Sequence, residues 1–319
     1  MGKTLLLMNV RWPTDRYYIK KICEENNQNI EAQATYKFSK YGLRYILAVI
    51  QMQKMKLPFQ WIWYEEWKRN LSQYDTIIVF YSLLNTNIIN YIHKKNPSAR
   101  IILYFWDSIT STTFTVPENK RQICELWSYD KSNCKTYNLR YNSQFYLPSM
   151  LSSAEEKYDI SIVIRDKGRY KQVKEMYDKF SKMGLKIFAR VVRDKTSKEQ
   201  DGKLYGNGME YSELLQIINE SKCIVELVKE GQEGLTLRSM ESIFYQKKLI
   251  TNNVKIKEEP FYCENNIMIW NNQDPNQIRE FLESDYKKMF MIINVPKKNL
   301  TVSTRYIEEK LQQGKLDEA

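Results

Sequence analysis

More than any other feature, one stretch constrains the fold of this chain: Cys223–Asn253, which reads CIVELVKEGQEGLTLRSMESIFYQKKLITNN. It opens with a largely apolar run of strand length, Ile224–Val228, followed by a turn with two glycines at residues 229–234. Residues 235–245 then carry apolar side chains at helical spacing, and residues 248–251 form a second apolar run. This order of strand, glycine turn, helix and strand predicts a βαβ unit, which joins neighbouring parallel strands.

The start of the predicted helix suits a phosphate group. It follows directly on Gly231 and Gly234, and a helix that begins there offers unpaired backbone N–H groups and the positive end of its dipole. Arg238 lies in the first turns and could add a bidentate contact to phosphate oxygens.

Two carboxylates frame this phosphate site, Glu233 on the turn and Glu241 about two turns along the helix. Glu241 could accept hydrogen bonds from a ribose diol, and Glu233 could reach hydroxyls beyond the far phosphate. The alternative is that Glu241 is a solvated helix residue and Glu233 an ordinary turn acid, because the E-x7-E spacing is a loose pattern.

The segment EGLTLRSMESIFYQKKLITNN resembles the nucleotide-sugar site of GT-B glycosyltransferases, whose retaining members carry E-x7-E at this place. It looks most like bacterial hexosyltransferases of lipopolysaccharide-core and capsular-polysaccharide synthesis. The resemblance implies that Glu241 holds the nucleotide ribose and that Glu233 contacts the donor sugar. It assigns the diphosphate to the amides around Gly234, Leu235 and Thr236. Leu235 and Ser242 stand where many relatives have a large aromatic residue or a glycine, so the donor sugar is not defined.

The length of 319 residues suits two domains of about 150 residues each. The segment 141–158 contains Pro148 and a serine cluster between two periodic regions, which indicates an interdomain connection. We therefore expect a domain at residues 1–150 and another at 151–319. The resemblance implies an α/β, GT-B fold: two Rossmann-like domains facing each other across a crevice, the first for the acceptor and the second for the donor.

The N-terminal half alternates strand-like runs with helical segments, as a Rossmann-like domain does. Apolar runs at residues 4–10, 74–81 and 100–106 are followed by polar residues, and the carboxyl ends of parallel strands line the crevice. Arg11, Asp15 and Asp107 follow such runs and are the acceptor-side candidates. For Arg11 and Asp15 the alternative is a surface turn around Pro13. No G-x-G-x-x-G motif is present, which argues against a dinucleotide site.

In the C-terminal half, a strand at residues 159–164 leads into the basic loop RDKGR, residues 165–169. The resemblance gives this loop the role of neutralising the donor diphosphate, through Arg165 and Lys167, with Arg169 able to replace either. A solvated basic turn is the alternative. Tyr211 is a candidate for stacking on the nucleotide base, or else a packing residue at the start of a helix.

Composition excludes several kinds of site. The five cysteines show no C-x-x-C spacing and His93 is the only histidine, which argues against disulfides, a metal centre and a His-based triad. We expect no metal and no cofactor. No apolar run reaches the ~18 residues of a membrane span, and the N-terminus is typical of a buried strand, not a signal peptide. A cytoplasmic protein is expected.

The net charge of +11 calls for an anionic partner, unless it reflects a composition bias of the source genome. No nucleic-acid-binding motif accompanies it, and we expect no nucleic-acid partner. An anionic membrane surface on the inner face of the cell membrane, or a lipid-linked acceptor, explains the charge equally well. The segment 41–70 places aromatic residues, including Trp61 and Trp67, beside basic ones. That pattern is typical of an interfacial helix, and equally of a core helix with a basic flank.

The leading hypothesis is a metal-independent, retaining glycosyltransferase. It would move a sugar from a nucleoside diphosphate sugar, with UDP favoured over GDP, to a hydroxyl of a glycan or lipid-linked glycan. The alternatives are a sugar-nucleotide epimerase or phosphorylase of the same fold, or a non-catalytic protein that binds a nucleotide sugar or nucleic acid. The single histidine counts against the epimerase.

Overall fold

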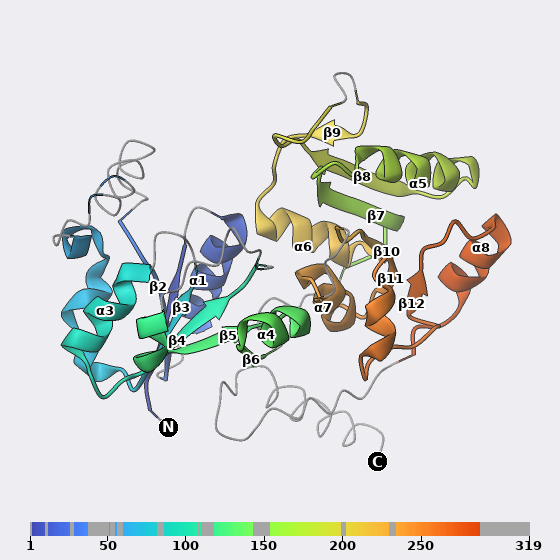
Figure 1. Ribbon diagram of the computed structural model, residues 1–319. Coiled ribbons are helices and arrows are strands. Elements are labelled where there is room, and N and C mark those ends of the chain that lie inside the picture. Colours follow the sequence, from blue (N-terminus) through green and yellow to red (C-terminus); the bar gives the residue numbers. More distant parts are fainter. Residues whose placement is uncertain are drawn as a thin grey trace, which may run out of the picture. The chain divides into compact units, whose positions relative to one another are not determined.

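A computed structural model describes residues 2–9, 12–25, 29–37, 51, 55, 60–81, 86–107, 109, 118–142, 154–198, 202–229 and 234–287. The chain forms two compact units, Met1–Ser143 and Gln144–Ala319. Each unit contains a six-stranded parallel sheet (Figure 1). The expected domain boundary at residues 150–151 falls in the range 143–153, outside the described residues.

In the N-terminal unit the strands run in the order β2-β1-β3-β4-β5-β6. They are β1 (Thr4–Met8), β2 (Ile30–Ala34), β3 (Thr76–Phe80), β4 (Arg100–Phe105), β5 (Glu125–Ser128) and β6 (Arg140–Tyr141). The helices are α1 (Pro13–Glu25), α3 (Thr86–Lys95) and α4 (Lys131–Tyr137), with short 3-10 turns at Gln60–Trp63, Glu66–Arg69, Leu71–Gln73 and Glu118–Gln122. The central strands are almost wholly buried, which explains their unbroken apolar runs.

Only some residues of the aromatic segment 41–70 belong to this core. Tyr64 and Trp67 are 2% and 1% exposed, and they stack with ring centroids 5.1 Å apart. Trp61 and Ile62, by contrast, are 46% and 49% exposed. The core interpretation therefore holds for the first pair, and the expectation of membrane contact stays a prediction for the second. Most of residues 38–59 lies outside the described part of the chain.

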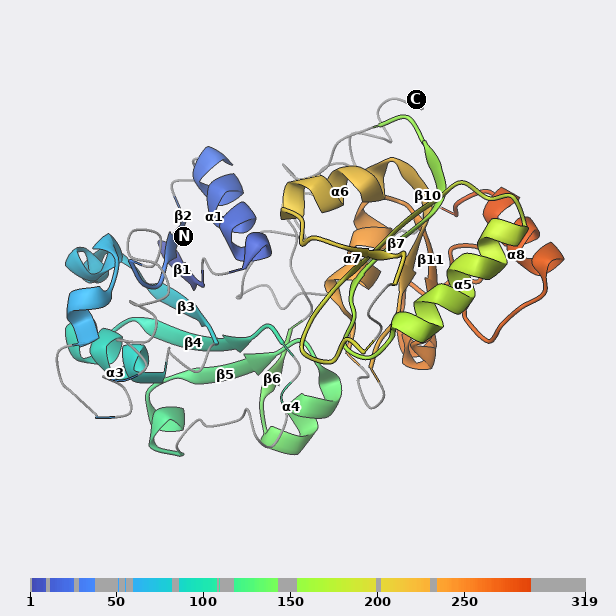
Figure 2. The same cartoon turned by 90° about the horizontal axis from the view of Figure 1, so that it is seen from above.

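In the C-terminal unit the order is β12-β11-β10-β7-β8-β9. The strands are β7 (Tyr158–Arg165), β8 (Ile187–Val192), β9 (Tyr205–Gly206), β10 (Ser221–Glu226), β11 (Lys248–Thr251) and β12 (Ile267–Ile269). The helices are α5 (Tyr170–Lys182), α6 (Tyr211–Asn219), α7 (Leu237–Phe244) and α8 (Pro275–Glu283), with a 3-10 turn at Val254–Glu258. Side chains of α5 and α8 share one core with β7 and β10, and α6 and α7 lie on the other face of the sheet (Figure 2).

The predicted βαβ unit is confirmed as β10–α7–β11, with β10 and β11 parallel and Cys223 opposite Lys248. Its helix begins at Leu237, two residues later than expected, because Thr236 caps it. The Thr236 hydroxyl accepts a hydrogen bond from the backbone N–H of Arg238 at 3.0 Å.

Two segments whose sequences are typical of loops contain regular structure. Residues 11–15, RWPTD, follow the first strand-like run, but Asp15 lies in the first turn of α1, because the helix begins at Pro13 and proline is favoured at the first helical position. The charges and glycines of the segment 195–208 are typical of a loop, but it contains β9 at Tyr205–Gly206.

Each sheet has one point where the chain changes direction across it. The chain runs from β1 to β2 on one side and later returns to β3 on the other side of β1. In the second sheet it runs from β7 to β8 and β9, and then crosses to β10 on the opposite side of β7. The carboxyl ends of strands at such points are where α/β sheets bind ligands. Within the described residues, no helix is long and apolar enough to cross a membrane.

Candidate functional site

Arg169 spans the point in the C-terminal unit where the chain changes direction. Its Nε donates to the carbonyl of Asp166 at 3.2 Å and its Nη2 to that of Arg165 at 2.7 Å, both just where β7 ends. Its Nη1 donates to the carbonyl of Leu227, the residue after β10. Burial lowers the pKa of Arg169, against the opposing effect of Asp166 and other nearby carboxylates. Three of its five N–H donors are thus used to join the two strand ends.

The basic loop folds on itself through its own amides. The N–H of Lys167 donates to Asp194 Oδ2 at 3.0 Å, and that of Gly168 donates to Asp166 Oδ1 at 3.1 Å. Lys167 and Gly168 have φ values of 45° and 80°, a left-handed conformation that glycine adopts easily. These two amides are thus engaged by carboxylates, whereas the side chains of Arg165 and Lys167 are exposed.

Asp166 holds the loop together as a charged, buried group. Burial alone would raise its pKa, but hydrogen bonds from the hydroxyls of Tyr205 and Ser197 and the amide of Tyr170 lower it below its usual value. The Tyr205 hydroxyl lies 2.5 Å from Asp166 Oδ2. Sequence reasoning missed this acid, although its place between Arg165 and Lys167 was a signal.

Glu241 lies inside the unit, so the alternative of a solvated helix residue is wrong. It is 1% exposed, and both of its carboxylate oxygens have partners. Oε1 accepts from the hydroxyl of Tyr211 at 2.6 Å, and Oε2 lies 2.5 Å from Arg238 Nη1. Burial raises the pKa of Glu241, while Arg238 and Tyr211 act to lower it. Its assignment to a ribose stays a prediction.

Tyr211 begins α6 and is 4% exposed, with its hydroxyl on Glu241. The packing interpretation therefore describes its ring better than stacking on a base. Of the three residues assigned to the diphosphate, Gly234 and Leu235 are buried, and Thr236 caps α7. Glu233 lies outside the described residues.

A second buried carboxylate, Glu226, was not predicted. It ends β10, is 2% exposed, and accepts hydrogen bonds from three hydroxyl groups. Ser239 and Thr251 donate to it at 2.6 Å each, and Thr236 also donates to it. Its place as an acid inside the apolar run CIVELV was the sequence signal for it.

In the N-terminal unit, two of the three acceptor-side candidates come close to each other. Asp15 is 9% exposed and its Oδ2 accepts from the amide of Asn9 at 3.0 Å. Burial raises the pKa of Asp15 to about 7, and the charge of Asp107 acts in the same direction. Trp106, beside Asp107, contacts Tyr18 of α1 edge to face at 5.5 Å. Arg11 lies outside the described residues.

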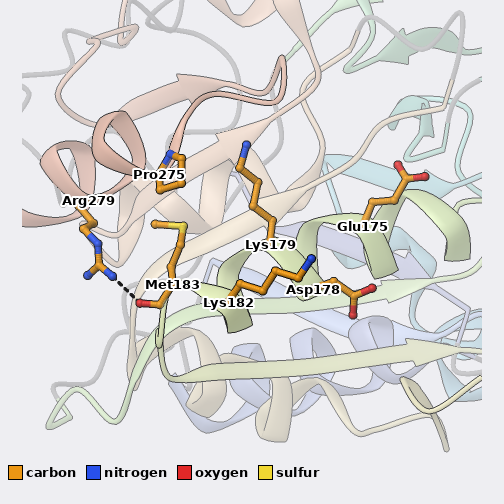
Figure 3. Close-up of a pocket in the computed structure, with 7 residues that line it drawn as sticks. All are labelled: Glu175, Asp178, Lys179, Lys182, Met183, Pro275 and Arg279. Atoms are coloured by element: carbon orange, nitrogen blue, oxygen red, sulfur yellow. Dashed lines mark hydrogen bonds between the residues drawn. The ribbon is translucent and has the colours of Figure 1, made fainter.

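A cavity of about 520 Å³ lies elsewhere in the C-terminal unit, between α5 and α8 (Figure 3). The Lys179 ammonium there is bound to the carbonyls of Asn272 and Gln273, and Arg279 donates to the carbonyl of Met183 at 2.5 Å. These contacts join the end of α5 to the start of α8. The residues that line this cavity are not among those described above. Among the described residues, no group of three His, Cys, Asp or Glu side chains could hold a metal ion.

No protein-family model matches the chain, and no curated protein matches it. Among solved structures, sucrose-phosphate synthase from Thermosynechococcus elongatus has a TM-score of 0.50 and 9% identity, over 100% of this chain and 98% of that one. The DNA-modifying enzyme β-glucosyltransferase, solved with and without uridine diphosphoglucose, has a TM-score of 0.49 and 12% identity, over 97% and 95% of the two chains. The likeness to the synthase shows the fold alone: an α/β, GT-B-like fold, as the sequence predicted.

Proposed function

We propose that this protein is a glycosyltransferase that moves a sugar from a nucleoside diphosphate sugar, UDP in preference to GDP, to a hydroxyl of a bacterial glycan or lipid-linked glycan. One observation carries the proposal. Arg165, Lys167, Arg169 and Arg238 gather where β7 and β10 end, at the point where the second sheet changes direction. Guanidinium and ammonium groups at such a point suit a diphosphate.

In the proposed reaction, the bond between the anomeric carbon and the diphosphate oxygen breaks, and the acceptor oxygen forms the new glycosidic bond. The acceptor's proton passes to the departing diphosphate. Negative charge grows on that leaving group, and the exposed side chains of Arg165 and Lys167 stabilise it, so that no metal ion is required. Retention of configuration is what the resemblance of the E-x7-E segment to retaining GT-B enzymes implies.

The acceptor is assigned to the N-terminal unit. Asp15 and Asp107 lie near the carboxyl ends of β1 and β4, and β1 borders the point where that sheet changes direction. Carboxylates accept hydrogen bonds from sugar hydroxyls, and Trp106 beside them offers an apolar ring. The proposal gives donor recognition to the C-terminal unit, which leaves the acceptor to the N-terminal one.

Thermal unfolding with added nucleotides tests the class of ligand. UDP at about 100 times its Kd should stabilise the protein by ~2.7 kcal/mol, seen as a rise in Tm. The double variant Arg165→Ala/Lys167→Ala should lose most of this rise. Lys182→Ala is the matched control, because it removes an exposed lysine from the far end of α5 and should leave the rise intact.

If neither UDP, GDP nor another common nucleoside diphosphate raises the Tm, the glycosyltransferase proposal fails. Binding of nucleic acid that falls steeply with salt would then favour the non-catalytic alternative. Turnover of a sugar nucleotide without any acceptor would favour the epimerase.

A further inference from the structure

The surroundings of Glu241 leave little room for a ribose. Both carboxylate oxygens are engaged, by Tyr211 at 2.6 Å and by Arg238 at 2.5 Å, and the side chain is 1% exposed. A carboxylate oxygen can accept two hydrogen bonds, but at 1% exposure a ribose diol could reach Glu241 only by moving these donors aside. Displacement would leave the Arg238 guanidinium or the Tyr211 hydroxyl without its partner in a buried place, which is unfavourable.

Arg238 is the partner that reaches outward. Its side chain is 15% exposed, and Nη2 donates to the carbonyl of Val163 on β7 at 3.3 Å. Within the described part of the chain, Glu241 and Val163 are the partners of this guanidinium. These two contacts hold the guanidinium group between α7 and β7. They use two of its five N–H groups.

The buried groups carry no excess of positive charge. Asp166, Glu226 and Glu241 are buried carboxylates, and the charge of Glu226 acts to raise the pKa of Glu241. Arg169 and Arg238 are the two guanidinium groups beside them. Their role is therefore better explained as orientation of ligand oxygens than as supply of net charge, which Arg165 and Lys167 provide.

We infer that Glu241 is a positioning residue: held by Tyr211, it orients Arg238 toward a phosphate of the bound nucleoside diphosphate, and another group recognises the ribose. The inference rests on the proposed function, because it names how the same site holds its donor. It changes the role of Glu241 from a direct acceptor for the sugar to a support for the phosphate contact.

Calorimetric titration of the full chain with UDP and with 2′-deoxy-UDP and 3′-deoxy-UDP distinguishes the two roles. Glu241→Gln should weaken UDP binding about 10-fold, a loss in the range of one hydrogen bond to a charged group. The factors lost on removing the 2′- or 3′-hydroxyl should be the same in Glu241→Gln as in the wild type. Adding Glu241→Gln to Arg238→Lys should cause little further loss, because both changes disturb one contact.

Tyr211→Phe keeps the test usable if Glu241→Gln does not fold, since it removes one hydroxyl and retains the ring. It should weaken UDP binding a few-fold and leave both deoxy penalties unchanged. A deoxy penalty that disappears in Glu241→Gln or Tyr211→Phe would overturn the inference and make Glu241 the ribose acceptor. Normal UDP affinity in both variants would also overturn it. A wild-type protein that binds no nucleoside diphosphate refutes the proposed function itself, a different outcome.

Discussion

Because the Asp15 carboxyl is buried, the free energy of unfolding depends on pH. Its carboxyl is 9% exposed, and the amide of Asn9 is its hydrogen-bond donor. Burial first, and the charge of Asp107 in addition, raise its pKa from 3.8 to about 7. The folded state therefore binds this proton more tightly than the unfolded state does. Stability is greatest below pH 4 for this group and falls as pH rises through 7.

We predict that Asp15→Asn makes the protein less sensitive to pH. The asparagine can still accept from Asn9 but carries no charge to bury. Between pH 4 and pH 7 the wild type should lose up to ~4 kcal/mol that the variant keeps, the amount corresponding to the raised pKa of Asp15. Denaturant unfolding at pH 4 and pH 8 measures the difference. Glu25→Gln, a change at an exposed side chain at the other end of α1, is the control, and parallel curves for Asp15→Asn and wild type would contradict the prediction.

The sequence identified Asp15 through its place after the first strand, but it could not give the burial or the raised pKa. The pKa depends on the hydrogen bond from the Asn9 amide and on the charge of Asp107, which follows a different strand. Glu241 shows the same limit. Its position was predicted from spacing, whereas its partners come from α6 and from the fixed rotamer of Arg238.

At the scale of the element, hydroxyl groups that donate hydrogen bonds to one buried carboxylate fix the start of α7. Thr236 and Ser239 at the helix start and Thr251 at the end of β11 all donate to Glu226 of β10. Hydrogen bonds to the Glu226 carboxylate thus connect all three elements of the βαβ unit. The sequence predicted the unit from its apolar pattern, and it missed this contact because hydrogen bonding between distant residues leaves no periodic signal.

We predict that Thr251→Val destabilises the C-terminal unit by ~1.5–3 kcal/mol, the usual loss for a hydrogen bond to a charged group. The variant loses the donor to Glu226 and also the acceptor for the amide of Asn253, at 3.0 Å. Thr251→Ser is the matched control: it keeps the hydroxyl and should cost clearly less. Urea unfolding gives both values, and equal losses in the two variants would contradict the prediction, because the methyl group would then matter as much as the hydroxyl.

At the scale of the whole molecule, the two units share the same arrangement of strands around their first strand. In each sheet the first strand has its sequential successor on one side and the return strand on the other. The sequence predicted two Rossmann-like domains because strand-like and helical runs alternate along it. It could not give the order of the strands, since order is decided by which faces the helices cover and by pairing between residues far apart in the chain. The candidate residues acquire a shared location only through that order.

The stereochemistry of the product is the last prediction, and it involves both units. We predict that the sugar keeps its anomeric configuration, and that Asp15→Asn slows turnover only moderately, because a retaining transfer lets the departing diphosphate take the acceptor's proton. Analysis of the product's anomeric carbon by NMR, for wild type and for Asp15→Asn, provides the measurement. An inverting transfer would need a protein base, and Asp15, with a pKa of about 7, has the chemistry of one. An inverted product, together with a loss of ~10²–10⁴-fold in kcat for Asp15→Asn, would refute retention and assign proton abstraction to Asp15.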